Sequence, residues 1–310
     1  MERTELSYLL HLGMHKTGST FIQTTLKKNT RRLRKAGAFV IDHDFPEARK
    51  VRRRAYTQIR NQTKAAAGAI ETLKSINSEI LERARKAGAQ VVIDTNENYI
   101  GTPLYTELLE KRSPAQFYPL AKDLIGYLTQ GIDRQSLTMF LMLRPHSAYL
   151  RSIYAEGIRN LVLQNTLDQF LHQVDLASIS FADLIADIQQ HVDAKNFYVF
   201  SSEDMNAGPP NWLKFVFKEV GLSQGNLKYT SEVVRQSLSK DQIEKLIIAQ
   251  ENVRQKKLSI EELVELRDRY IIAPGRARKK ITFPQDIASK WGDQWSADWA
   301  YCQRYIRSPE

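Results

Sequence analysis

Residues 13–20, GMHKTGST, place two glycines, one lysine and three hydroxyl side chains within eight positions. An apolar run at residues 6–12 precedes this segment, and apolar side chains at roughly helical spacing follow it over residues 21–33. A strand that leads through a glycine loop into a helix directs several backbone N–H groups and the positive end of the helix dipole at one point. The pattern therefore predicts a binding loop for phosphate or sulfate, with a helix that begins at Ser19 or Thr20.

The position of the lysine separates this loop from the common ATP-binding loop. In a Walker A loop the lysine directly follows the second glycine, but here Ser19 follows it and Lys16 lies inside the loop. The segment resembles the 5′-phosphosulfate-binding loop of sulfotransferases that use 3′-phosphoadenosine 5′-phosphosulfate (PAPS). The alternative is an ordinary strand–helix turn with an exposed lysine. The resemblance implies contacts to the 5′-phosphosulfate from His15, Lys16, Thr17, Gly18, Ser19 and Thr20.

A second motif follows the most apolar predicted strand, residues 137–143. Arg144 comes directly after this strand, and Ser152 lies eight residues later, about two turns into the helix predicted at 145–160. An arginine fork and a serine hydroxyl can hold a phosphate together. The spacing resembles the family's motif for the 3′-phosphate of PAPS. One difference is that the family usually has its proline two residues after the arginine, whereas Pro145 is adjacent to it.

The reaction that this resemblance implies also needs a charge-neutralising group and a general base. Sulfuryl transfer passes through a loose transition state, like phosphoryl transfer, so Lys16 is expected to neutralise the leaving phosphate oxygen. Glu97 comes just after the strand predicted at 90–94, where α/β sheets place ligand-binding groups. The segment DTNEN at 94–98 is similar to the strand-Ser-Ser-Glu-Asn stretch of bacterial members, with threonine and asparagine in place of the serines. We predict Glu97 as the base, and the alternative for it is a capping carboxylate. The other candidate bases, in falling order, are His15, Asp42, His43 and His146.

Two weaker likenesses lie later in the chain. Residues 199–205, VFSSEDM, resemble the strand-Glu-Asp-Leu segment of the family and precede an amphipathic helix that ends at Gly221. Glu203 and Asp204 are there expected to orient loops rather than to take part in the chemistry. Beyond residue 222, a basic cluster is similar to the family's late cofactor-contacting loop, or it is an exposed basic turn. The cluster consists of Arg276, Arg278, Lys279 and Lys280.

Short apolar runs alternate with segments of helical periodicity, which predicts an α/β fold. The expected architecture is a three-layer sandwich, similar to P-loop NTPases, with a central, mainly parallel five-stranded sheet and helical insertions. We expect one domain over residues 1–310, with a core at about 6–222 and a helical C-terminal region at about 223–310 packed on it. Residues 43–60 are expected to form a loop or a broken helix over the surface, and residues 101–119 a loop region with about one turn of helix. Strands are expected at 6–12, 38–41, 90–94, 137–143 and 196–200, and helices at about 19–36, 63–87, 120–130, 145–160, 167–174, 181–192 and 210–221, with charged helices from 238 onward.

Composition narrows the range of function classes. A hydrophobic content of 42% is ample for a folded core. The single cysteine, Cys302, excludes an internal disulfide, and no H-x3-H or H-E-x-x-H spacing occurs, so no metal is expected. No apolar run approaches the roughly 18 to 20 residues that span a bilayer, and the N-terminus does not resemble a signal peptide. We therefore expect a cytoplasmic protein without stable membrane insertion.

Positive charge is concentrated in one part of the chain. Residues 27–60 carry twelve lysines and arginines and three acidic residues, in a chain of net charge +10. Such a surface attracts polyanions without choosing between them, or is simply a solvated face. Aromatic side chains are not interleaved with this charge, so no nucleic-acid partner is expected.

The main alternative to a sulfotransferase is a P-loop kinase or NTPase in which Asp94 and Thr20 bind Mg²⁺. A fold that binds the sulfate donor without turnover would share every motif. The favoured prediction is a PAPS-dependent sulfotransferase that releases 3′,5′-adenosine diphosphate (PAP). It is expected to act on a hydroxyl of a small molecule or glycan, most plausibly a carbohydrate or glycoconjugate.

Overall fold

A computed structural model describes residues 6–61, 66–110, 114–203, 211–222, 227–228, 238–272 and 281–307. As predicted, it is an α/β structure around a five-stranded parallel sheet. The strand order is β2-β3-β1-β4-β5. The basic cluster at 276–280 and Asp204 lie outside the described residues. The strands are β1 (Ser7–Leu12), β2 (Ala38–Val40), β3 (Val91–Asn96), β4 (Leu137–Leu143) and β5 (Phe197–Ser201).

The strands are apolar almost throughout because helices cover both faces of the sheet. On one face, α1 (Ser19–Lys35) and α10 (Asn211–Glu219) pack through Ile22, Leu26 and Phe217. On the other face, Leu10 and Leu12 contact a larger apolar core to which helices α4, α6, α7 and α9 contribute. The bounds of these helices are α4 (Ala66–Lys86), α6 (Ala121–Thr129), α7 (His146–Arg159) and α9 (Phe181–Gln189).

The register of the sheet brings the ends of three strands together. Leu12 at the end of β1 is paired with Asn96 at the end of β3 on one side and with Leu141 in β4 on the other. The segments that follow these strands therefore begin side by side at the carboxyl edge of the sheet. This is the edge where ligands bind in open α/β sheets.

Of the two alternatives expected for residues 43–60, a loop or a broken helix, the structure has the second. Two helices, α2 (Ile41–Asp44) and α3 (Pro46–Arg60), occupy this part of the chain. The inward positions of α3 are Ala48, Arg52, Ala55 and Ile59, which have ordinary helical spacing. The pattern is hidden in the sequence because one inward position is an arginine, and its charge is neutralised by a partner that is distant in the sequence.

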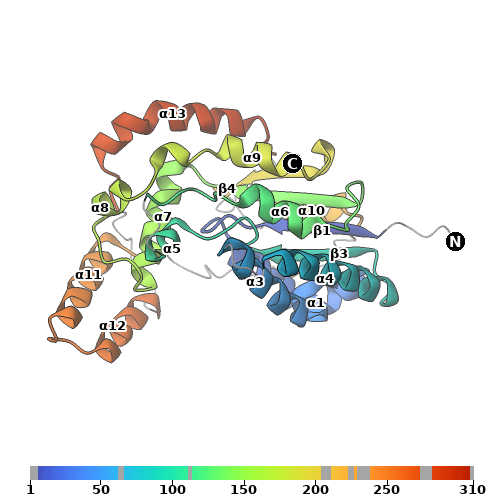
Figure 1. Ribbon diagram of the computed structural model, residues 1–310, viewed down its shortest axis with the longest axis horizontal. Coiled ribbons are helices and arrows are strands. Elements are labelled where there is room, and N and C mark those ends of the chain that lie inside the picture. The colour runs from blue at the N-terminus through green and yellow to red at the C-terminus, as the bar shows by residue number, and fades with distance from the viewer. Residues whose placement is uncertain are drawn as a thin grey trace.

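The C-terminal part is helical, with α11 (Lys240–Arg254), α12 (Ile260–Ile272) and α13 (Gln285–Gln303). The pair α11 and α12 extends from one side of the molecule, and α13 arches over α9 (Figure 1). Asp298 of α13 accepts hydrogen bonds from the backbone N–H groups of Phe181 and Ala182, at 2.9 and 3.1 Å, and so caps α9. No described helix is both long and apolar enough to cross a membrane.

The remaining short helices connect these layers. They are α5 (Leu104–Leu109), within the segment expected to be a loop with about one helical turn, and α8 (Leu167–His172). Pro145 precedes α7 as its N-cap rather than standing at its first helical position. The other helices begin and end within a few residues of their predicted bounds.

Candidate active site

The loop between β1 and α1 is closely packed and leads directly into the N-terminus of α1. The helix begins at Ser19, as predicted, after Gly18, whose φ of 102° is a conformation that glycine adopts without strain. A Cβ atom at Gly13 would lie 2.6 Å from Ser19 Oγ and 2.7 Å from Glu97 Cα. Only glycine fits there, because the backbone after β3 lies directly against the start of the loop.

Several polar groups of this loop suit an anion. The first turn of α1 contains no acidic residue and, among the described residues, no side chain caps it. The hydroxyl of Ser19 is buried and has no partner within the described part of the chain, whereas Thr17 donates to the Met14 carbonyl at 2.6 Å and stiffens the loop. Thr20 is half-buried in the first turn. A phosphate or sulfate oxygen would satisfy both the helix terminus and the Ser19 hydroxyl.

Lys16 is held at both its backbone and its side chain. Its φ is 67°, an uncommon conformation for a residue other than glycine. Its Nζ lies 3.1 Å from Glu156 Oε2 in α7, and Arg159 Nη1 lies 2.9 Å from the same oxygen. Glu156 therefore orients the lysine ammonium while it is itself oriented by a second cation. Neither Glu156 nor Arg159 stands out in the sequence, although both recur with Ser152 on one face of α7.

Arg144 connects the two predicted phosphate motifs. Its Nη1 donates to the carbonyl oxygen of Lys16 at 3.1 Å and to Ser152 Oγ at 3.1 Å. Burial lowers the pKa of Arg144, the nearby Arg151 lowers it further, and Glu203 raises it. Lys16 and Arg144 are 128 positions apart in the chain, and the fold brings them into direct contact.

Glu97 lies in the turn directly after β3, beside the loop. It is half-buried and its Cα abuts Gly13. The neighbouring Asn96 accepts hydrogen bonds from the backbone N–H and side-chain amide of Asn98, at 3.0 and 3.1 Å. The predicted base, the predicted lysine loop and the Arg144–Ser152 pair are thus gathered at the carboxyl ends of β3, β1 and β4.

The other candidate bases occupy different environments. His15 is buried between Tyr118 and Asn98, and burial lowers its pKa to about 4, so the ring is neutral near pH 7. His146 is stacked on Phe181 and its Nε2 is 3.0 Å from Asp298. The Asp42 carboxylate lies 3.3 Å from the Arg49 guanidinium. Asp42 and His43 both belong to the short helix α2, which packs against α3 and β3.

The aspartate that a kinase would use for Mg²⁺ is engaged in the core. Asp94 is 2% exposed. Its Oδ2 atom accepts hydrogen bonds from Tyr8 and Arg52, and its Oδ1 atom accepts one from Tyr99 at 2.6 Å. To bind Mg²⁺, Asp94 would have to leave this network. Within the described ranges no group of three or more His, Cys, Asp or Glu side chains could hold a metal.

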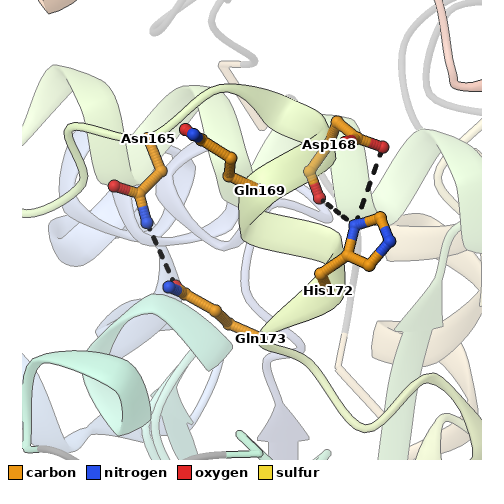
Figure 2. Close-up of a pocket in the computed structure, with 5 residues that line it drawn as sticks. All are labelled: Asn165, Asp168, Gln169, His172 and Gln173. Carbon is orange, nitrogen blue, oxygen red and sulfur yellow. Dashed lines mark hydrogen bonds and ion pairs between the residues drawn. The ribbon is translucent and has the colours of Figure 1, made fainter.

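A separate hollow of about 540 Å³ lies on the surface at α8 (Figure 2). It is lined by polar side chains, and His172 contacts both the backbone oxygen of Asp168, at 2.9 Å, and its carboxylate, at 3.7 Å. None of the candidate active-site residues contributes to it. Its lining consists of Asn165, Asp168, Gln169, His172 and Gln173.

Two buried histidines are expected to make the folded state less stable at mildly acid pH. Burial lowers the pKa of His15 from 6.5 to about 4, and that of His11 to about 3. Between pH 6.5 and 4 the unfolded chain binds a proton at each ring and the folded chain does not. The free energy of unfolding should therefore fall by about 1.4 kcal/mol per pH unit and per ring as the pH decreases.

The variant His15→Gln cannot titrate at this position and should lose the contribution of one ring to that slope. Urea unfolding at a series of pH values between 4 and 6.5 measures it. The control is His172→Gln, since the His172 side chain is 63% exposed. An unchanged slope in His15→Gln would contradict a neutral His15 in the folded protein.

Neither a family model nor a curated protein sequence matches this chain. Among solved structures, a sulfotransferase from Alicyclobacillus acidocaldarius is similar to it, with a TM-score of 0.45 and 12% sequence identity. The similarity covers 84% of this chain and 96% of that chain.

Proposed function

We propose that this protein transfers a sulfuryl group from PAPS to an acceptor hydroxyl. The observation that carries the proposal is the position of Arg144, which contacts both the Lys16 carbonyl and the Ser152 hydroxyl. A nucleotide with one phosphate on the 5′ oxygen and another on the 3′ oxygen of its ribose could bind to both motifs at once. PAPS is such a nucleotide, and its 3′-phosphate distinguishes it from ATP.

The residues present suit each part of this donor. The N-terminus of α1 and the buried Ser19 hydroxyl offer donors for the 5′-phosphosulfate, and the glycine at position 13 keeps the loop free of a side chain there. The Arg144 fork and Ser152 offer a charged and a neutral donor for the 3′-phosphate. When bound, PAPS would supply the sulfuryl group.

Two side chains would then carry the chemistry. The ammonium of Lys16 neutralises the charge that develops on the leaving phosphate oxygen, and its orientation is maintained by Glu156. The carboxylate of Glu97 takes the proton from the acceptor hydroxyl. Asn98 is exposed beside Glu97, and its amide can hydrogen-bond an acceptor hydroxyl. This supports a carbohydrate or glycoconjugate acceptor as part of the same proposal.

The binding of PAP, compared by calorimetry with AMP and with ATP and Mg²⁺, tests the proposal. Wild type should prefer PAP, and Arg144→Ala should bind PAP about 10- to 100-fold more weakly because a charge-assisted pair of hydrogen bonds is lost. The affinity for AMP should fall by a smaller factor than the affinity for PAP, since AMP has no 3′-phosphate and depends on Arg144 only through the hydrogen bond to the Lys16 carbonyl.

Two further variants sharpen this comparison. Arg144→Lys keeps the positive charge but not the planar guanidinium fork. Its affinity for PAP should lie between those of wild type and Arg144→Ala. Arg254→Ala removes an equal charge from the surface of α11, where the side chain is 61% exposed, and should bind like wild type. Mg²⁺-dependent binding of ATP that is tighter than the binding of PAP would overturn the proposal and favour the kinase.

A further inference from the structure

A chain of hydrogen bonds runs from the first turn of α7 to the segment that carries Glu97. Tyr149 Oη donates to Tyr118 Oη at 3.3 Å, and the backbone N–H of His15 donates to the same oxygen at 3.1 Å. Tyr118 Oη is also 2.8 Å from His15 Nδ1. His15 Nε2 is 3.3 Å from Asn98 Oδ1, and Asn98 Nδ2 donates to Asn96 Oδ1 at 3.1 Å. These five residues link α7, the lysine loop and the end of β3.

The direction of each hydrogen bond follows from the donors. Tyr118 Oη accepts from Tyr149 and from the His15 backbone, which occupies both of its lone pairs. Its own hydrogen must therefore point to His15 Nδ1. Because Nδ1 accepts, the ring proton of the neutral histidine lies on Nε2, which donates to the Asn98 carbonyl oxygen. With these directions, each of the hydrogen bonds has one donor and one acceptor. The pattern requires a neutral His15 ring, and burial of His15 favours the neutral form.

Tyr118 is fixed by its backbone as well as by its hydroxyl. Its φ is 43°, an uncommon conformation for a residue with a side chain. A Cβ atom at Gly101, which has a φ of 130°, would lie 3.1 Å from the Tyr118 ring. The ring also packs edge-on against Phe117 at a centroid distance of 4.6 Å. The hydroxyl of Tyr118 is therefore held at a defined place between the lysine loop and α7.

We propose that Tyr118 and Asn98 are positioning residues, which act through His15 to hold Glu97 in place relative to Lys16. Asn96 and Asn98 flank Glu97 in sequence, and His15 is adjacent to Lys16. The chain of hydrogen bonds thus joins the two segments that carry the proposed base and the proposed charge-neutralising group. The positioning role rests on the proposed function, because it assumes that Glu97 and Lys16 take part in one reaction.

The variant Tyr118→Phe removes one oxygen atom and tests this role. The turnover number, kcat, measured as PAP release from PAPS with the best hydroxyl acceptor from a panel, should fall about 10- to 100-fold because small misplacements of reacting groups are costly. The affinity for PAP should stay within about threefold of wild type, since Tyr118 does not belong to either phosphate motif. Asn98→Ala should also lower kcat and leave the affinity for PAP within about threefold of wild type, but it should in addition raise the KM for the acceptor, because the Asn98 amide can hydrogen-bond the acceptor hydroxyl.

A matched control separates positioning from simple destabilisation. Tyr198 is a largely buried tyrosine of β5 whose hydroxyl is 2.7 Å from Glu219, and it lies outside this chain of hydrogen bonds. Tyr198→Phe should lose a comparable amount of stability in urea unfolding but keep the wild-type kcat. If Tyr118→Phe also keeps the wild-type kcat, the positioning role is overturned.

A second measurement does not depend on the reaction. In wild-type protein with ¹⁵N-labelled histidine, NMR should show His15 protonated at Nε2, and Tyr118→Phe should lose this single tautomer. A wild-type ring protonated at Nδ1 would overturn the proposed chain of hydrogen bonds. Failure of wild type to bind PAP would instead overturn the proposed function and with it the positioning role, whereas the tautomer would still show whether the chain of hydrogen bonds exists.

Discussion

Lys16→Ala is expected to lower the rate of sulfuryl transfer by about 10²- to 10³-fold, the usual effect of removing one group that stabilises developing charge. The lysine ammonium lies in the loop between β1 and α1, and its backbone carbonyl is fixed by Arg144 at 3.1 Å. The effect should appear in kcat, measured as PAP release from PAPS, because most of the charge on the leaving oxygen develops only in the transition state. The affinity for PAP should fall by less than about tenfold, since PAP is still held at the Arg144 site.

Two variants control this experiment. Lys16→Arg keeps a cation but in a planar, bulkier group, and should retain part of the rate. Lys27→Ala removes a lysine from the exposed part of α1 and should behave like wild type. Urea unfolding of Lys16→Ala is needed as well, because Glu156 would lose its ion pair with Lys16 and keep the one with Arg159. A kcat within about threefold of wild type would refute the role of Lys16 in the chemistry.

The parts of the fold that the sequence predicted correctly depend on local patterns. The strand at residues 137–143 and the helix start at Ser19 match the structure because apolar periodicity and a glycine boundary involve neighbouring residues only. The position of Glu97 near the loop could also be predicted, since parallel strands end at one edge of the sheet. These predictions do not require knowledge of which helices pack against one another or against the loop.

The parts that could not be predicted depend on contacts between distant side chains. Glu156 is an ordinary polar residue in the sequence of α7, and its role beside Lys16 is set by how α7 packs against the loop. His15 was considered as a base, but its partners, Tyr118 and Asn98, are 103 and 83 positions away. The sequence leaves residues 43–60 open between a loop and a broken helix, because Arg52, an inward residue of α3, looks like a surface residue until its partner is known.

Arg52→Met is expected to lower the free energy of unfolding by about 3–5 kcal/mol, the usual cost of leaving one member of a buried ion pair alone. Arg52 is 1% exposed and contacts Asp94, which is 2% exposed. It also donates to Tyr8 at 3.0 Å and to Asn77 at 2.5 Å. Methionine keeps much of the side-chain volume, so the loss should come mainly from the uncompensated carboxylate and not from a cavity.

The double variant Arg52→Met/Asp94→Leu separates these causes. Replacing both charges by apolar groups should recover only part of the lost stability, because the uncompensated charge is gone but the buried Tyr8 and Tyr99 hydroxyls have lost the carboxylate that accepted their hydrogen bonds. Urea unfolding of the two single variants and the double variant measures the interaction directly. The exposed neighbour Arg53 provides the control, and Arg53→Met should change stability by less than about 0.5 kcal/mol.

A substitution at Asp94 also distinguishes a kinase from the proposed sulfotransferase. Tyr99, which donates to Asp94, lies two positions after Glu97, so the network supports the segment that carries the proposed base. If Asp94 were a Mg²⁺ ligand, Asp94→Asn would abolish Mg²⁺-dependent ATP binding while disturbing the core little. Under the structural role argued above, Asp94→Asn should instead destabilise the fold, because Arg52 would lose its counter-charge, and folded Asp94→Asn should bind PAP as wild type does.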